Sequence, residues 1–228
     1  MNQSVRILTL AVLASLVACT PSWAQDAVPA RNDPLHITKL ENEYVRVFNV
    51  YIPPGKSTTF HEHAFDFSVV FVEGSKLKNE MMGGTTAEVV VNTGTVAYGG
   101  FAAKPVVHRI TNLSDNANWQ VAFEILVPGA GKFQISTRDA AYKIELDNER
   151  LRAWRLILQP GQSVPAITQT APGLRIALSD GKIVQQVGGS DQEISMKRGE
   201  FLWQPARSSR SLRNAGNVPV EFVEYELK

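Results

Sequence analysis

The feature that most constrains this chain is an internal repeat at an offset of 106 residues. Residues 40–46 (LENEYVR) superpose on residues 146–152 (LDNERLR), and residues 54–55 (PG) on residues 160–161 (PG). After small gaps that shorten the offset, the match resumes with 94–98 against 199–203, and ends with 123–124 against 225–226. A repeat of this length means that one fold forms twice. We place the boundary near 136–141, which gives units at 38–138 and 139–228.

Each copy is a series of short β-prone runs separated by Gly, Pro, Asn and Asp. In the first copy these runs cover residues 44–52, 67–72, 88–91, 96–98, 106–110 and 119–127. No long stretch has a helical period. Many short strands at this spacing predict an all-β fold of two tandem jelly-roll barrels. Trp119, Trp154 and Trp203 fall in such runs, and we expect them to pack in the barrels.

The N-terminus resembles a secretory signal. Arg6 precedes an uncharged run over 7–18, too short for a stable membrane anchor, and residues 22–24 (SWA) predict cleavage after Ala24. We therefore expect a periplasmic or secreted protein, with residues 1–24 as the signal peptide. The alternative is a lipoprotein, because residues 16–19 (LVAC) would place a lipid on Cys19. Residues 25–37 are expected to form an extended arm that carries His36 as a surface histidine.

The charge balance excludes several classes of partner. The chain has 23 Lys and Arg against 22 Asp and Glu, and 44% of its residues are hydrophobic. There is no global positive field to attract nucleic acid. We expect no transmembrane segment in the mature form, and a small molecule as partner.

Three histidines form the group of residues that indicates a metal site. His61 and His63 are separated by one residue in a β-prone run, so both rings lie on one strand face and can meet one ion. A third ligand must come from another strand. His108 supplies it, in the run that precedes Asn112.

These residues resemble the motifs of the cupin superfamily. The first motif is matched by Gly55, His61, His63 and Gly74, and the second by Gly94, His108 and Asn112. The resemblance implies two double-stranded β-helix barrels, and a divalent metal ion held in the first barrel by His61, His63 and His108. Imidazole ligands suit iron, zinc, copper, manganese or nickel, so the metal is not identified.

The sequence departs from the cupin pattern at the acidic ligand. Phe67 occupies that position, with Ser68 in the only other register, and residues 103–105 (AKP) replace a Pro-x-Gly. Three neutral imidazoles leave the charge of a divalent ion uncompensated, so we expect an anionic ligand in its open positions. Asp66 and Glu80 are weaker candidates for the missing carboxylate.

The second copy lacks the histidines. Ile167 and Gln169 correspond to His61 and His63, and Arg210 corresponds to His108. We expect no metal in this degenerate barrel and a structural role for it. Arg207, Arg210 and Arg213 are either solvated rim charges or an anion pocket in its mouth.

Two functions stay open. The first is a metal-dependent oxidoreductase, similar to the three-histidine dioxygenases among cupins, that acts on a small organic acid, with Tyr98 as the candidate catalytic residue. The second is a non-catalytic protein of the cell envelope that binds a metal or small ligand. Cupins often dimerise, so the resemblance also implies a homodimer as an open possibility.

Overall fold

The computed structural model describes residues 26–228, which form β-strands and one short 3-10 helix. The strands make four sheets, two in each half of the chain. The predicted signal peptide and Cys19 lie outside the described residues. Within residues 26–228, no helix is long and apolar enough to cross a membrane.

Barrel 1 consists of two five-stranded sheets. Sheet A has the order β1 (Val28–Pro29), β4 (His61–His63), β9 (Val106–Asn112), β6 (Lys76–Met81) and β7 (Thr86–Val90). Sheet B has the order β2 (His36–Glu41), β3 (Val45–Ile52), β10 (Asn118–Ile125), β5 (Asp66–Glu73) and β8 (Val96–Gly99). Apart from the consecutive pairs β2–β3 and β6–β7, neighbours in these sheets are not consecutive in the chain, as a jelly roll requires.

Barrel 2 repeats this plan with one strand fewer. Sheet C has the order β11 (Lys143–Asp147), β12 (Leu151–Leu158), β19 (Val220–Leu227), β14 (Gly173–Ala177) and β17 (Phe201–Gln204). Sheet D has the order β13 (Ser163–Gln169), β18 (Ser208–Asn214), β15 (Gly181–Val187) and β16 (Ser190–Met196). The prediction of an all-β chain of two tandem barrels is confirmed, and the expected boundary falls in the segment that joins β10 to β11.

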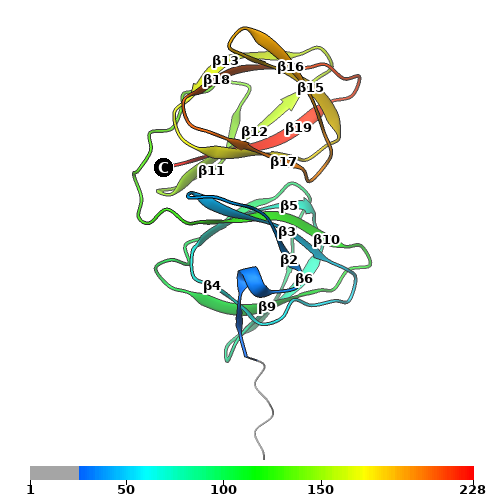
Figure 1. Cartoon of the computed structure of the whole chain (residues 1–228). Helices are drawn as coiled ribbons and strands as arrows, with labels where there is room; N and C mark the ends of the chain where they lie inside the picture. The colour runs from blue at the N-terminus through cyan, green and yellow to red at the C-terminus, as the bar shows by residue number, and fades with distance from the viewer. Residues whose placement is uncertain (1–25) are drawn as a thin grey trace, which may run out of the picture.

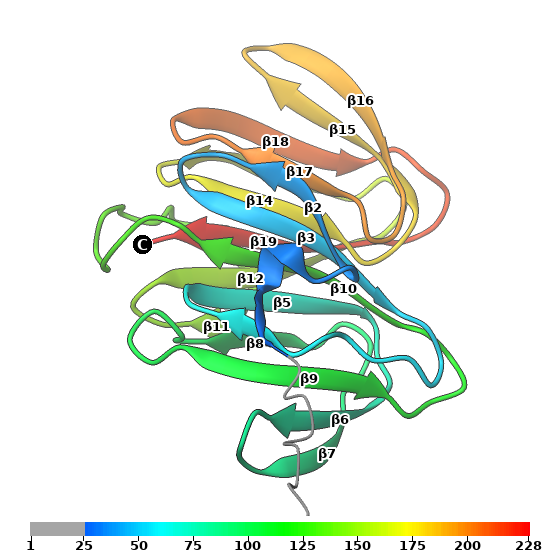
Figure 2. The same ribbon diagram turned by 60° about the horizontal axis from the view of Figure 1, so that its bottom comes forward.

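The two barrels are stacked, with the N-terminal half below the C-terminal half in Figure 1. In Figure 2, strands of sheet D lie at the top, those of sheet A at the bottom, and sheets B and C lie between them. Sheets B and C face each other across one hydrophobic core, in which Val47 and Phe123 of barrel 1 pack with Ala153 and Tyr225 of barrel 2.

The central strands of sheets B and C, such as β3, β5 and β14, are buried on both faces. In β3, Val45 and Val47 face the core between the barrels, whereas Phe48 and Val50 face the interior of barrel 1. Because successive side chains of a strand point to opposite faces, such a strand is apolar at most of its positions. This explains the continuous hydrophobic runs of the sequence. Trp154 lies in the interior of barrel 2, as expected, while Trp119 and Trp203 pack against the core between the barrels.

The repeat reappears in the turns. Gly55 and Gly161 both have a positive φ, +67° and +78°, which favours glycine. Asn112 donates from its side-chain amide to the carbonyl oxygens of Ile52 and Asn116. Asn214 makes the equivalent two hydrogen bonds, to the carbonyl oxygens of Leu158 and Val218. The asparagine of the second motif therefore ties strand ends together in both barrels.

Candidate metal centre

Strand β4 presents His61 and His63 to the interior of barrel 1. Both side chains are buried, and Glu62 between them is more exposed, as strand alternation requires. β4 pairs antiparallel with β9 in a register that sets His61 opposite His108. The ring centroids of His61 and His108 are 4.7 Å apart, and those of His63 and His108 are 5.2 Å apart. The structure thus brings the three predicted histidines together.

A fourth histidine joins them, and the expectation that His36 is a surface residue is wrong. His36 begins β2, is only 5% exposed, and its ring lies 4.5 Å from that of His61 between centroids. It is buried because residues 28–36 are integrated into barrel 1. Val28 pairs with His61 in sheet A, and His36 pairs with Val50 in sheet B.

Three of the four rings are anchored through Nδ1. The Nδ1–H of His36 donates to Asp33 Oδ1, that of His61 to the carbonyl oxygen of Thr59, and that of His108 to Asn79 Oδ1, each at 3.0 Å. This tautomer leaves the lone pair of each ring on Nε2. Hydrogen bonds of this kind orient metal-binding histidines in proteins.

The donor atoms converge in a way that fits a metal ion. Ring nitrogens of His36, His61 and His63 all lie within 4.8 Å of one another, so this buried cluster can hold a metal. The Nε2 atoms of His61 and His63 are 3.1 Å apart. Among the described residues, Nε2 of His108 and Nδ1 of His63 are buried without a hydrogen-bond partner. His108 adjoins the cluster, and its role as a ligand stays a prediction.

Burial keeps these imidazoles neutral. Removal from water, reinforced by the neighbouring His36, lowers the pKa of His61 to about 3 and that of His108 to about 4. Burial also holds the pKa of His63 well below its ordinary value. Neutral imidazole is the form that binds metals, so the site is ready for an ion at neutral pH.

The cluster borders a cavity of about 180 Å3 in barrel 1. Since one water takes roughly 30 Å3 in the liquid, only a small molecule fits there. Most of its wall is apolar, formed by Val50, Ile52, Phe67, Val69, Phe71 and Phe101. Thr58 and Gln120 add polar groups. No carboxylate is found among the described residues that line it.

The position of the missing acidic ligand is filled as the sequence indicates. Phe67 packs on His63, with ring centroids 4.4 Å apart. Asp66 is turned away and accepts a hydrogen bond from Arg150 Nε at 2.6 Å. Glu80 pairs with Arg109 at 3.1 Å. Neither weaker candidate therefore takes part in the cluster.

Tyr98 lies at the margin of the cavity, but its ring belongs to the other side of sheet B. It pairs with Ser68 in β5 and packs against the core between the barrels. Burial and the nearby Asp66 carboxylate raise its pKa to about 12. A hydroxyl this weakly acidic stays protonated, and its catalytic role stays a prediction.

The equivalent place in barrel 2 holds no imidazole. β13 and β18 pair with Ile167 opposite Arg210, the same register that sets His61 opposite His108. Arg210 is buried, whereas Arg207 and Arg213 are exposed. The three arginines thus do not form one pocket.

The sequence contains a signal for the burial of His36, upstream of residue 40 where the clearest part of the repeat begins. At the offset of 106, Asp33 corresponds to Asp139 and His36 to Tyr142. Asp33 accepts a hydrogen bond from the backbone N–H of Leu35, and Asp139 accepts one from Ala141. Extending the repeat upstream places residues 33–36 inside the barrel.

Comparisons with known proteins find the fold but no close relative. No family model and no curated protein matches the sequence. The structure of AerE from Microcystis aeruginosa is similar with a TM-score of 0.56 at 11% identity, over 86% of this chain and 98% of that one.

Two enzymes of known structure are also similar. Oxalate decarboxylase of Bacillus subtilis, described with Mn(II) centers, has a TM-score of 0.60 at 14% identity, over 81% of this chain and 69% of that one. Salicylate 1,2-dioxygenase of Pseudoaminobacter salicylatoxidans, described with gentisate, has a TM-score of 0.57 at 11% identity, over 84% of this chain and 69% of that one. At such identities the likeness concerns the fold alone. The chain has the two-domain cupin fold.

Proposed function

We propose that this chain is a metal-dependent oxidoreductase that acts on a small organic acid in the cavity of barrel 1. The observation that carries the proposal is the set of buried imidazoles of barrel 1. Three of them are anchored through Nδ1, the Nε2 atoms of His61 and His63 are 3.1 Å apart, and Nε2 of His108 is buried without a hydrogen-bond partner among the described residues. His36, His61 and His63 would hold the ion, with His108 beside them. A divalent ion bound there would supply Lewis acidity and, if it is redox-active, a place for dioxygen.

The protein's own residues would select and shield the substrate. Neutral imidazoles do not offset the charge of a divalent ion, which favours a carboxylate substrate. Apolar walls such as Phe67 and Phe101 would exclude water and pack on the organic part. The similar dioxygenase and decarboxylase support this class of reaction by analogy of fold.

Turnover is the first test. The protein, loaded in turn with Fe(II), Mn(II), Cu(II), Ni(II) or Zn(II), is offered small mono- and dicarboxylates under oxygen while product and oxygen uptake are followed. His63→Ala should abolish turnover with the fold retained. Gln169→Ala, at the equivalent position of barrel 2, is the matched control and should keep it.

The second candidate is a non-catalytic protein that binds a metal or small ligand. One observation favours it: the described walls of the cavity contain no carboxylate to act as general base, and Tyr98 packs on the opposite face of its sheet. Retention of one metal or ligand per chain without product, lost in His63→Ala, supports this candidate over the enzyme.

We also propose export of the chain. Mass spectrometry of the mature protein distinguishes its two forms, because cleavage after Ala24 leaves Gln25 first and lipidation leaves a modified Cys19 first. An intact N-terminus on the protein from its native host contradicts both.

A further inference from the structure

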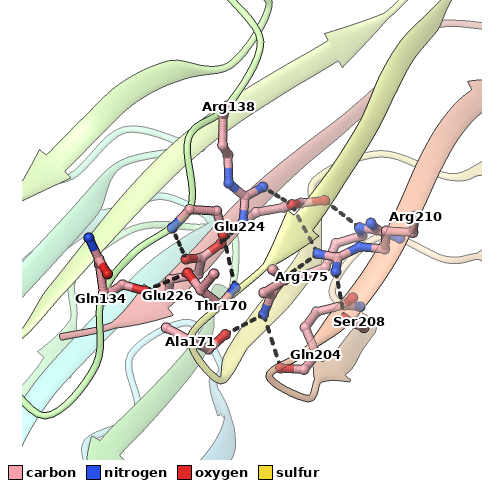
Figure 3. A network of polar contacts seen from close by, with 12 residues as sticks. Gln134, Arg138, Thr170, Ala171, Arg175, Gln204, Ser208, Arg210, Glu224 and Glu226 are labelled. Atoms are coloured by element: carbon pink, nitrogen blue, oxygen red, sulfur yellow. Dashed lines mark hydrogen bonds and ion pairs between the residues drawn. The ribbon is translucent and has the colours of Figure 1, made fainter.

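The interior of barrel 2 contains a charged network where barrel 1 is apolar. In sheet B, Ala122 lies opposite Val69 on neighbouring strands. In sheet C, the equivalent strands set Glu224 opposite Arg175, and both side chains are fully buried. Figure 3 shows this network, in which side chains from β14, β18 and β19 point toward one another.

The network contains more positive than negative charge. Three guanidinium groups, those of Arg138, Arg175 and Arg210, meet the two carboxylates of Glu224 and Glu226. Arg175 Nε donates to Glu224 at 2.6 Å and Arg138 Nη2 to Glu226 at 2.7 Å, whereas Arg210 lies 3.6 Å from Glu224. With two carboxylates for three cations, one positive charge is left in excess. Of the three arginines, Arg210 has the longest ion-pair distance to a carboxylate oxygen.

Several donors of these arginines are unused. Nε of Arg138, Nη2 of Arg175 and Nε of Arg210 are buried with no hydrogen-bond partner among the described residues. Burial, together with the charges of Arg175 and Arg138, lowers the pKa of Arg210 to about 10 despite the attraction of Glu224. A buried cation without full compensation destabilises a fold unless an anion joins it.

A pocket opens beside Arg210. It has a volume of about 320 Å3, and Arg210 lines it together with Gln185, Gln192, Gln204, Ser208 and Trp203. Arg210 Nη1 lies 3.2 Å from the hydroxyl of Ser208, and Arg175 Nη1 donates to Gln185 Oε1 at 3.1 Å. The pocket thus combines one guanidinium, amide and hydroxyl groups with apolar side chains, among them Val187, Ile194 and Leu202.

We propose that this pocket binds one small carboxylate, with the guanidinium of Arg210 as its charged partner. The planar fork of arginine matches a carboxylate. An excess of one positive charge matches a monoanion better than doubly charged phosphate. Arg210 stands where barrel 1 has His108, so the second barrel would keep a ligand site and replace the metal by a guanidinium.

Binding is tested on the full-length mature chain, treated with a chelator and carrying His63→Ala so that barrel 1 cannot hold a metal-bound anion. Acetate, propionate, benzoate and inorganic phosphate are titrated by calorimetry and by thermal unfolding. We expect saturable binding of one monocarboxylate per chain and a rise in Tm. Absence of binding by every carboxylate, or tighter binding of phosphate than of all of them, overturns the proposal.

Variants locate the site. Arg210→Gln should weaken carboxylate binding at least tenfold, while Arg213→Gln, exposed on the same strand, should leave it unchanged. Without anion, Arg210→Gln should be at least as stable as its parent, because it removes the excess charge. Unchanged binding in Arg210→Gln overturns the proposal.

Two further variants decide the case if Arg210→Gln does not fold. Arg210→Lys keeps the charge but loses the fork, and Ser208→Phe fills the pocket. Both should weaken carboxylate binding, by several-fold and at least tenfold respectively. Binding equal to the parent in both variants contradicts the proposal.

Discussion

The rings of His36 and His61 lie 4.5 Å apart although they belong to different sheets of barrel 1. Asp33 orients both of them. Its Oδ1 accepts from His36 Nδ1, and its Oδ2 accepts from the backbone N–H of Thr59 at 2.7 Å, while the carbonyl oxygen of Thr59 accepts from His61 Nδ1. Hydrogen bonds from His36 and Thr59 outweigh burial, the largest single effect, and hold the pKa of this carboxyl well below its usual range. One ionised carboxylate therefore positions two rings.

Asp33→Asn should weaken metal binding by about 10–100-fold, the usual effect of removing a partner that orients a metal-binding histidine. Competition titration of Zn(II) or Mn(II) against a chromogenic chelator measures this.

The matched control is Asp139→Asn, which removes the equivalent turn contact in barrel 2, where no histidine is present. Asp33→Asn should lose more stability than Asp139→Asn, because Asp33 is buried and accepts hydrogen bonds from His36 and Thr59, whereas Asp139 is exposed. An equal loss of metal affinity in both would mean that Asp33 acts only through the fold.

Phe67→Glu should strengthen metal binding by tenfold or more. The phenyl ring of Phe67 lies against His63, and a carboxylate there would offset the charge that neutral imidazoles leave. The metal-free variant should be less stable than the parent, because an acid is buried without a partner. The measurement is the rise in Tm on adding metal. Phe71→Glu, on the same face of β5, controls for burying an acid, and an equal rise in both variants contradicts the prediction.

Stability should fall in acid through Glu224. Burial raises the pKa of this carboxyl, but the charges of Arg175, Arg138 and Arg210 outweigh burial and lower it far below its usual value. Because the folded pKa is depressed, the contribution of Glu224 is complete above about pH 4.3, the unfolded value, and is lost as the pH falls below it.

Glu224→Gln tests this sign. At pH 7 it should cost about 3–5 kcal/mol, the usual effect of removing one partner of a buried ion pair. Urea unfolding from pH 7 to pH 3 measures the difference in free energy of unfolding between variant and parent. This difference should become smaller below about pH 4.3. A difference that stays constant over this range would assign the loss to packing.

Phe123→Ala should destabilise the chain by about 3–5 kcal/mol, as for other buried aromatic residues. The ring of Phe123 meets that of Tyr225 edge to face at 5.0 Å, one residue from each barrel. Both barrels should then unfold in one transition at a lower temperature. Calorimetry checks this, and two separated transitions in the parent protein contradict it. A double-mutant cycle with Tyr225→Ala should give a coupling of about 0.5–1.5 kcal/mol.

The repeat and the short apolar runs were sufficient to predict the fold, because strand period and turn residues are local signals. The proximity of His61, His63 and His108 was also predictable, since the first two share a strand and the third precedes a repeated asparagine. The burial of His36 was not predicted, because it depends on pairing with β3, which is not visible in a window around His36. Asp33 is in that window, but its meaning emerges only when the repeat is extended upstream to Asp139.

The charged interior of barrel 2 could not be predicted from the sequence for a related reason. Arg175, Arg210 and Glu224 come from three separate strands, and nothing local marks them as neighbours. Burial is opposite to the default for such residues. The pattern indicated solvated charges or a mouth cluster of Arg207, Arg210 and Arg213, of which only Arg210 faces the interior.

The core shared by sheets B and C has a consequence for how the two copies can diverge. A substitution at the contact between the barrels changes the packing of both copies at once. A substitution inside one barrel changes only the packing and the ligand site of that barrel. After a duplication, therefore, selection should preserve the facing sheets as a pair and leave the two interiors free to acquire separate chemistries.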